Sequence, residues 1–137
     1  MTLAYLATPY TKYPRGLNAA WKHASRLAGR LMNAGVNVYS PIAHCHALSK
    51  HGRVDALDLA IWYPHCELMA ERCDVLIVAH LPTWEDSVGI QFETEIFERA
   101  KKPIFDVDPK NLKMVCRARS LTFAQVARSA EMRRAYA

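Results

Sequence analysis

The chain has 137 residues, of which 51% are hydrophobic and 23% are charged, enough apolar side chains for one globular domain with a core. This composition excludes a disordered chain, and no apolar run is long enough to span a membrane. The start Met1-Thr2-Leu3 lacks the basic region of a signal peptide, and the four cysteines are scattered without a CxxC pair. We therefore expect a reduced cytoplasmic protein without a membrane segment.

The net charge of +5 is unevenly distributed. Residues 1–109 hold 11 basic and 12 acidic side chains, whereas residues 110–137 hold seven basic side chains and one acidic side chain, Glu131. A basic segment can bind nucleic acid or another anionic partner, and it can also be the solvated face of a helix. No signature of a nucleic-acid-binding fold accompanies it, so a nucleic-acid partner is not expected. We expect an α/β domain over residues 1–109 and a basic helical extension over residues 110–137 that packs on or near it.

The first third of the chain predicts a strand, a helix and a second strand. Residues 3–7 form a short apolar run, followed by a polar loop at residues 8–16. The helix predicted over residues 14–33 has apolar side chains every three to four residues, and Gly35 is suited to end it. Residues 36–40 predict the second strand.

The next segment is less regular. Residues 42–52 predict a loop, whereas residues 55–72 have a helical pattern that Pro64 should kink or restart. The loop contains His44, His46 and His51.

The most informative stretch begins with an apolar run without alternation at residues 75–79, which predicts a buried parallel strand. Ser87 has the side chain preferred at a helix N-cap, and the helix predicted over residues 88–101 ends before Pro103. One stripe of this helix should face the sheet and place Glu93 near the carboxyl end of a central strand. The stripe comprises Gly89, Phe92, Glu93, Ile96 and Ala100.

Residues 104–107 predict another strand, and a capping box at Thr122 and Gln125 predicts a last helix to about residue 134. Whether residues 110–120 add an edge strand stays open. The alternation of strands and helices predicts an α/β fold, a three-layer sandwich with a parallel sheet of four to five strands, Rossmann-like or flavodoxin-like.

The loop at residues 8–16 lies where a dinucleotide-binding protein carries its G-x-G-x-x-G motif. Only Gly16 is present, so dinucleotide binding by that mechanism is not expected. The loop leads into a helix N-terminus and is rich in hydroxyl and basic groups, which suits a sugar or phosphate site, or an ordinary polar loop. These side chains are Thr8, Tyr10, Thr11, Lys12, Tyr13 and Arg15.

Four motifs are distributed over residues 3–107. They are Tyr5-Leu-Ala-Thr-Pro-Tyr10, Ser40-Pro41, Cys73-Asp74-Val-Leu-Ile and Trp84-Glu-Asp-Ser87-Val-Gly89-Ile-Gln-Phe-Glu93. Together they resemble the nucleoside 2-deoxyribosyltransferase-like superfamily, and the motif with Trp84 resembles a small branch known only as a domain of unknown function. The resemblance implies a nucleoside or nucleoside 5′-monophosphate as ligand and a homodimer or higher oligomer.

The resemblance also implies roles for individual residues. Glu93 matches the nucleophile that attacks the anomeric carbon of a 2-deoxyribosyl group, and Tyr5 matches a tyrosine beside it. Ser87 matches a residue that binds the sugar or phosphate. An alternative for Glu93 is a buried structural carboxylate paired with a basic side chain. The expected substrate-binding residues are Thr8, Pro9, Tyr10, His46, Asp86, Ser87 and Gly89.

One position departs from the superfamily. Cys66 stands where the family has an aspartate that acts on the departing base, and a thiol is a poor general acid at neutral pH. Glu67, Asp58 or His65 could take over this role, and Cys66 could also be an ordinary buried thiol. We therefore expect N-glycosidic bond cleavage or deoxyribosyl transfer, with a weak or inactive nucleotide-binding module as the alternative.

The run His44-Cys45-His46 is rich in metal-ligand types, and His65 and Cys66 add two more. Their spacing matches no standard zinc site, so we expect no metal and no cofactor. One of the first two histidines is expected to line the ligand pocket and the other to pack.

Trp62 and Trp84 can either stack on a base or pack against the sheet. Packing is the more common role of a tryptophan in such a position.

Overall fold

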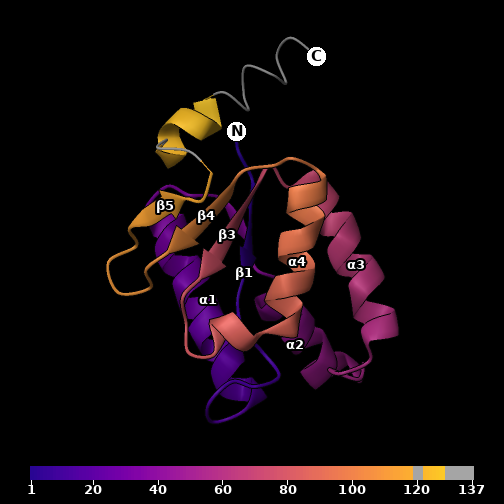
Figure 1. Cartoon of the computed structure of the whole chain (residues 1–137). Coiled ribbons are helices and arrows are strands. Elements are labelled where there is room, and N and C mark those ends of the chain that lie inside the picture. Colours follow the sequence, from indigo (N-terminus) through magenta and orange to yellow (C-terminus); the bar gives the residue numbers. More distant parts are fainter. Residues whose placement is uncertain (119–121, 129–137) are drawn as a thin grey trace.

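The computed structural model describes residues 1–118 and 122–128 (Figure 1). It contains one five-stranded sheet in the order β2-β1-β3-β4-β5. The strands are β1 (Ala4–Ala7), β2 (Val38–Tyr39), β3 (Val75–Ala79), β4 (Ile104–Val107) and β5 (Met114–Cys116). The helices are α1 (Leu17–Asn33), α2 (Pro41–Gly52), α3 (Leu59–Arg72) and α4 (Val88–Arg99), with a short 3-10 turn, η1 (Trp84–Asp86).

Helices cover both faces of the sheet: α1 lies on one face, and α3 and α4 lie on the other (Figure 1). Strands β1 to β4 are parallel, and only β5 pairs in the antiparallel direction. This arrangement confirms the predicted α/β three-layer sandwich, and the strand order matches flavodoxin-like folds. Among the described residues, no helix is both long and apolar enough to cross a membrane.

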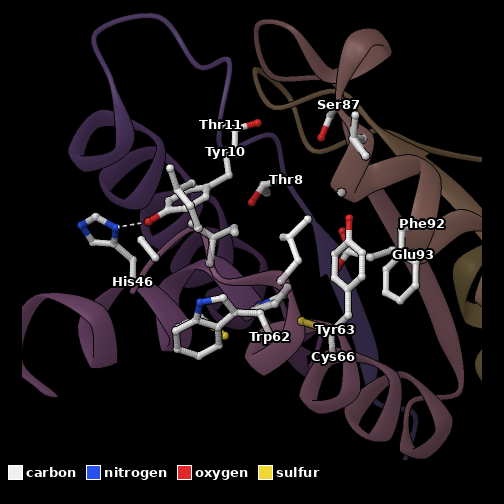
Figure 2. Close-up of a pocket in the computed structure, with 18 of the residues that line it drawn as sticks. Thr8, Tyr10, Thr11, His46, Trp62, Tyr63, Cys66, Ser87, Phe92 and Glu93 are labelled. Carbon is white, nitrogen blue, oxygen red and sulfur yellow. Dashed lines mark hydrogen bonds between the residues drawn. The ribbon is translucent and has the colours of Figure 1, made fainter. Parts of the chain in front are cut away.

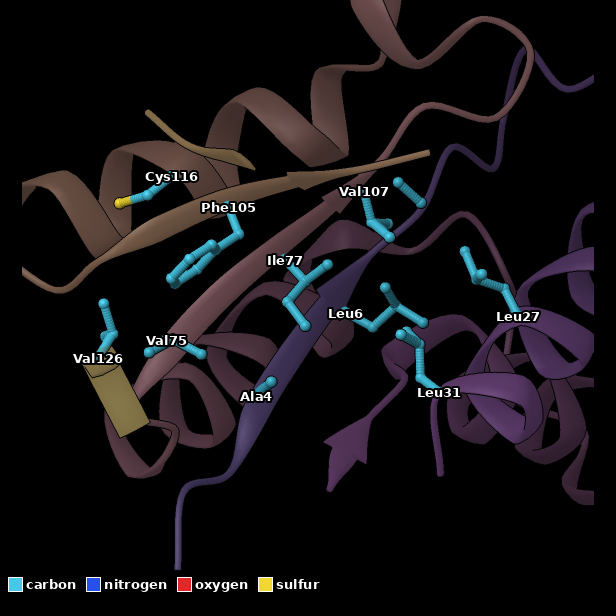
Figure 3. Close-up of a cluster of buried hydrophobic side chains, with 11 residues drawn as sticks. Ala4, Leu6, Leu27, Leu31, Val75, Ile77, Phe105, Val107, Cys116 and Val126 are labelled. Atoms are coloured by element: carbon cyan, nitrogen blue, oxygen red, sulfur yellow. The ribbon is translucent and has the colours of Figure 1, made fainter. Parts of the chain in front are cut away.

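The pleat of the strands divides the core into two layers. Leu6 and Ile77 point toward α1, where they pack near Leu27 and Leu31 (Figure 3). The alternate residues, such as Tyr5, point toward α3 and α4. Because both faces are covered, every residue of β1 and β3 is buried, which explains why these segments read as continuous apolar runs.

Two helix ends follow the sequence prediction. The Ser87 hydroxyl accepts a hydrogen bond from the backbone N–H of Ile90 at 3.2 Å and so caps α4. At the end of α1, Gly35 adopts a positive φ of 86°. The N–H groups of Gly35 and Val36 then donate to the carbonyls of Met32 and Leu31 at 3.0 and 2.9 Å, a Schellman motif that satisfies the last carbonyls of the helix.

The prediction of a loop over residues 42–52 is wrong, because this segment belongs to α2. Ser40 caps the helix by accepting from the N–H of Ala43 at 3.2 Å, and Pro41 occupies the first turn, where its missing N–H costs nothing. Helix α3 continues through Pro64, so the helix does not restart there.

The open question about an edge strand is answered by β5, which pairs with β4. The capping box of the last helix is present, since Gln125 N–H donates to Thr122 Oγ1 at 3.2 Å and Thr122 N–H donates to Gln125 Oε1 at 2.9 Å. This helix is described up to residue 128, and its predicted continuation lies outside the described residues. Val126 packs into the core layer of α1, so this helix covers the same face of the sheet.

Candidate functional site

A cavity of about 320 Å³ opens at the carboxyl ends of β1 and β3, between α2, α3 and α4. Here the chain leaves β1 toward one face of the sheet and β3 toward the other, which is where open α/β sheets bind their ligands. Figure 2 shows hydroxyl groups of Thr8, Tyr10 and Ser87 on one side of this cavity, and the rings of Trp62 and Tyr63 on the other.

Most of the residues expected at the site do line the cavity. They are Thr8, Tyr10, His46, Cys66, Ser87, Gly89 and Glu93. Pro9 and Asp86 do not: Pro9 is fully buried, and Asp86 is exposed at the end of η1, where the turn leaves Ser87 rather than Asp86 at the cavity. Tyr5 lies in β1 and is completely buried, with Glu93 and Cys66 as its neighbours.

Glu93 lies on the second turn of α4 and is only 7% exposed. Removal from water raises the pKa of its carboxyl group well above the ordinary value, Cys66 raises it further, and the nearby Tyr5 hydroxyl opposes the shift. Within the described part of the chain, no lysine or arginine forms an ion pair with Glu93. The pairing that would mark a structural carboxylate is therefore not found there.

Two buried hydroxyl groups near Glu93 have no hydrogen-bond partner of regular geometry among the described residues. They belong to Tyr5 and to Thr8, which is 3% exposed and lines the cavity. Burial, followed by the charges of Glu93 and Cys66, raises the pKa of the Tyr5 hydroxyl. An unsatisfied buried hydroxyl costs about 1–3 kcal/mol, so the Thr8 hydroxyl is a ready partner for a polar ligand group.

Tyr10 is held in place by a short chain of hydrogen bonds (Figure 2). Its hydroxyl lies 2.6 Å from His46 Nδ1, and His46 Nε2 lies 2.8 Å from Asn18 Oδ1. Burial and then Lys50 lower the pKa of His46, which favours the neutral ring. A neutral ring that donates from Nε2 to Asn18 accepts at Nδ1 from Tyr10, and this leaves the Tyr10 oxygen free to accept a hydrogen bond from a ligand.

Cys45 and Cys66 both line the cavity, and their thiols interact. Hydrogen bonding from Cys45 lowers the pKa of Cys66 to about 7, although burial acts in the opposite direction. The same interaction and burial raise the pKa of Cys45. A pKa near neutrality makes Cys66 a better proton donor and acceptor at pH 7 than an ordinary thiol.

The three residues considered as substitutes for the missing aspartate do not line the cavity. Asp58 caps α3 by accepting from the N–H of Ala60 at 3.1 Å. His65 lies 3.2 Å from the Tyr39 hydroxyl, and Glu67 faces Arg99 at 3.8 Å near the surface. Among these four residues, Cys66 is thus the one that the fold brings next to Glu93, where the Tyr5 hydroxyl also lies.

The apolar wall of the cavity contains residues that the sequence did not single out. Tyr63 stacks on Phe92 with ring centroids 4.0 Å apart, and Leu57 and Leu59 extend this wall. The four-residue spacing of Leu59 and Tyr63 is visible in the sequence, but it is equally compatible with core packing. Trp62 lines the same wall.

Trp84, in contrast, lies outside the cavity lining. Its ring stacks on His80 with the ring centroids 3.9 Å apart, and it packs against the core. Packing is therefore its observed role.

Among the described residues, no three His, Cys, Asp or Glu side chains come together in a way that could hold a metal ion. Because α2 is helical, His44 and His46 do not point the same way as they would in an extended chain. His46 faces the cavity, whereas His44 is exposed and stacks on His65 with the ring centroids 5.4 Å apart.

Comparison with curated proteins finds no match for the chain. A family model described as "Domain of unknown function (DUF1937)" matches residues 2–108, which contain the whole cavity lining. The chain therefore belongs to the DUF1937 family.

Proposed function

We propose that the cavity binds a nucleoside and that Glu93 cleaves its N-glycosidic bond. The observation that carries this proposal is a buried carboxyl group that faces a ligand-sized cavity without a basic partner among the described residues. A structural role would call for such a partner, whereas a nucleophile must stay free to react. The resemblance of residues 3–107 to nucleoside 2-deoxyribosyltransferase-like proteins supports the same reaction.

Both ends of a nucleoside have a counterpart in the cavity. The hydroxyl groups of Thr8, Tyr10 and Ser87 suit a sugar, while Trp62 and the Tyr63 ring suit a flat base. The described lining contains no lysine or arginine, so an unphosphorylated nucleoside fits better than a monophosphate.

The reaction requires Glu93 to ionise, and burial resists this in the empty cavity. Cys66, with a pKa of about 7, is the neighbour able to accept the proton as a thiolate, and the Tyr5 hydroxyl lies beside both groups. Transfer of this proton leaves a carboxylate on Glu93, next to the positive charge that develops on the sugar.

The sugar is then transferred from the base to Glu93. A Glu93 oxygen forms a bond to the anomeric carbon, the carbon–nitrogen bond breaks, and its electron pair leaves with the base, which takes the proton from the Cys66 thiol. Water, or a second base, then displaces Glu93 from the sugar and gives its proton to the Cys66 thiolate, so that Glu93 leaves as a carboxylate. Water gives hydrolysis and a second base gives transfer.

The alternative function is a nucleotide-binding module without turnover. A specific observation favours it: Cys66 occupies the position of an aspartate in the superfamily, and the pKa of Glu93 is raised rather than lowered. Such a module would keep the hydroxyl groups and aromatic wall but release no base.

The test is incubation with a panel of 2′-deoxynucleosides, ribonucleosides and their 5′-monophosphates, with chromatography for free base. Base release that is abolished in Glu93→Gln but retained in Glu95→Gln, an exposed position on the same helix, supports the proposal. Thermal stabilisation by a nucleoside without any base release favours the binding module. If the folded protein neither binds nor cleaves any member of the panel, both functions are excluded.

We also propose that the protein is a homodimer. Leu57, Leu59 and Val88 line the cavity yet are 56%, 48% and 56% exposed, and Ile61 adds a further exposed apolar side chain on α3. A second copy covering this rim would bury these side chains and close the cavity. Light scattering that gives the mass of a single chain at micromolar concentration would contradict this arrangement.

A further inference from the structure

The charges of this chain are separated along the sequence. Residues 1–54 contain seven lysines and arginines and no aspartate or glutamate. Residues 55–109 contain four basic and 12 acidic side chains. The first segment comprises β1, α1, β2 and α2, so the acid-free part of the sequence corresponds to defined elements of the fold.

Helix α1 turns this composition into a regular surface. Its Ala20, Ala24, Leu27 and Leu31 side chains are buried against the sheet. Lys22, Arg26 and Arg30 recur at every fourth position on the opposite, exposed side. Side chains with this spacing are neighbours about 5–6 Å apart on a helix surface.

One further cation adjoins this stripe. The Arg30 guanidinium donates to the carbonyl groups of Pro109 and Lys110, the latter at 3.0 Å, which brings Lys110 beside the end of α1. The basic face is defined as Lys22, Arg26, Arg30 and Lys110.

No described aspartate or glutamate forms an ion pair with any residue of the basic face. The nearest acid along the chain, Asp108, accepts a hydrogen bond from the backbone N–H of Lys110 at 2.8 Å. Like charges at this spacing repel one another, and a bound polyanion relieves that repulsion.

We propose that the basic face binds the phosphate backbone of nucleic acid, without reading its sequence. Evenly spaced single cations suit a polymer of evenly spaced phosphates. An amphipathic membrane-binding helix would need its apolar side free, but that side of α1 is buried. An acidic protein partner would call for a large apolar anchor between the charges, and that side of α1 presents Gly29 and Asn33 instead.

The test measures the affinity of the whole chain for a short fluorescent duplex by anisotropy, at salt concentrations from about 50 to 200 mM. We expect binding that is independent of base sequence, with an affinity that falls steeply as salt rises. Each phosphate contact contributes about 0.9 to the slope of log affinity against log salt, so four contacts give a slope of about −3 to −4.

The variant K22Q/R26Q removes two of these cations from exposed helix positions, where glutamine is well tolerated. It should reduce the slope by about 2 and weaken binding at low salt about ten-fold. The matched control is R72Q/R99Q, which removes the same charge from α3 and α4 and should leave the slope unchanged.

Three results would overturn the proposal: no binding at the lowest salt, equal weakening in both double variants, or equally effective competition by polyglutamate. The second would mean that net charge alone attracts the duplex, and the third that the face accepts any polyanion. Nucleoside cleavage should be unchanged in K22Q/R26Q, because neither residue lines the cavity, so this test is independent of the proposed function.

Discussion

Replacing Glu93 by glutamine should make the stability of the protein less sensitive to pH. The folded state raises the pKa of this carboxyl group, whereas in the unfolded chain the pKa is about 4.3. Below the unfolded pKa, Glu93 is protonated in both states and its ionisation does not affect stability. Between the two pKa values only the unfolded chain loses the proton, so the wild-type protein loses stability as the pH rises.

The size of this effect follows from proton linkage. One proton retained only by the folded state lowers the free energy of unfolding by about 1.4 kcal/mol for each pH unit in this window. For a chain of this length, that corresponds to roughly 3–6 °C in Tm per pH unit. Glutamine has nearly the same shape and does not titrate, so the stability of Glu93→Gln relative to wild type should increase with pH by this amount.

The assay is thermal unfolding of both proteins at pH values from about 4 to about 8, analysed as the difference in Tm so that the other titrating groups cancel. Glu95→Gln, on the exposed side of the same helix, serves as the control and should give a difference that is flat with pH. A flat difference for Glu93→Gln, or one that falls with pH, would refute the reasoning. A flat difference would mean that folding leaves the pKa of Glu93 unchanged, and a falling one that the folded protein stabilises the carboxylate.

Three further outcomes are expected. Alkylation of Cys66 by iodoacetamide, followed by mass spectrometry, should accelerate through about pH 7. Cys45→Ala should move the midpoint upward, because alanine cannot donate the hydrogen bond that lowers the pKa of Cys66, and an unchanged midpoint would contradict the coupling. His46→Phe removes the hydrogen-bond partner of the Tyr10 hydroxyl. It should raise KM for a cleaved nucleoside about ten-fold with less effect on kcat, and an unchanged KM would exclude a role of Tyr10 and His46 in substrate binding. Leu31→Ala should lower the free energy of unfolding, measured with urea, by about 2–5 kcal/mol, since this side chain is 1% exposed in the core layer of α1. A loss below about 1 kcal/mol would mean that this layer is loosely packed.

Local patterns in the sequence were sufficient to predict much of the fold. The apolar run at residues 75–79 becomes β3, since a strand covered on both faces needs no polar alternation. Ser87 and Gly35 act at helix ends, where a single side chain or a single backbone conformation decides the outcome. The spacing from Ser87 to Glu93 was likewise enough to place the carboxyl group on the buried side of α4.

Other features depend on contacts between residues far apart in the chain. The sequence suggested a loop over residues 42–52, because Ser40 and Pro41 are equally compatible with the end of a strand and the start of a helix. The approach of Cys45 to Cys66, and the chain from Tyr10 through His46 to Asn18, are formed only by the packing of α1, α2 and α3.

Glu93 shows most clearly which features follow from the sequence and which need the tertiary structure. Helical periodicity alone determined that its carboxyl group faces inward, because the period depends only on neighbouring residues. Only the tertiary structure decided that a cavity lies beside it and that no basic side chain of the described residues pairs with it, since both the cavity and any partner come from other elements of the fold.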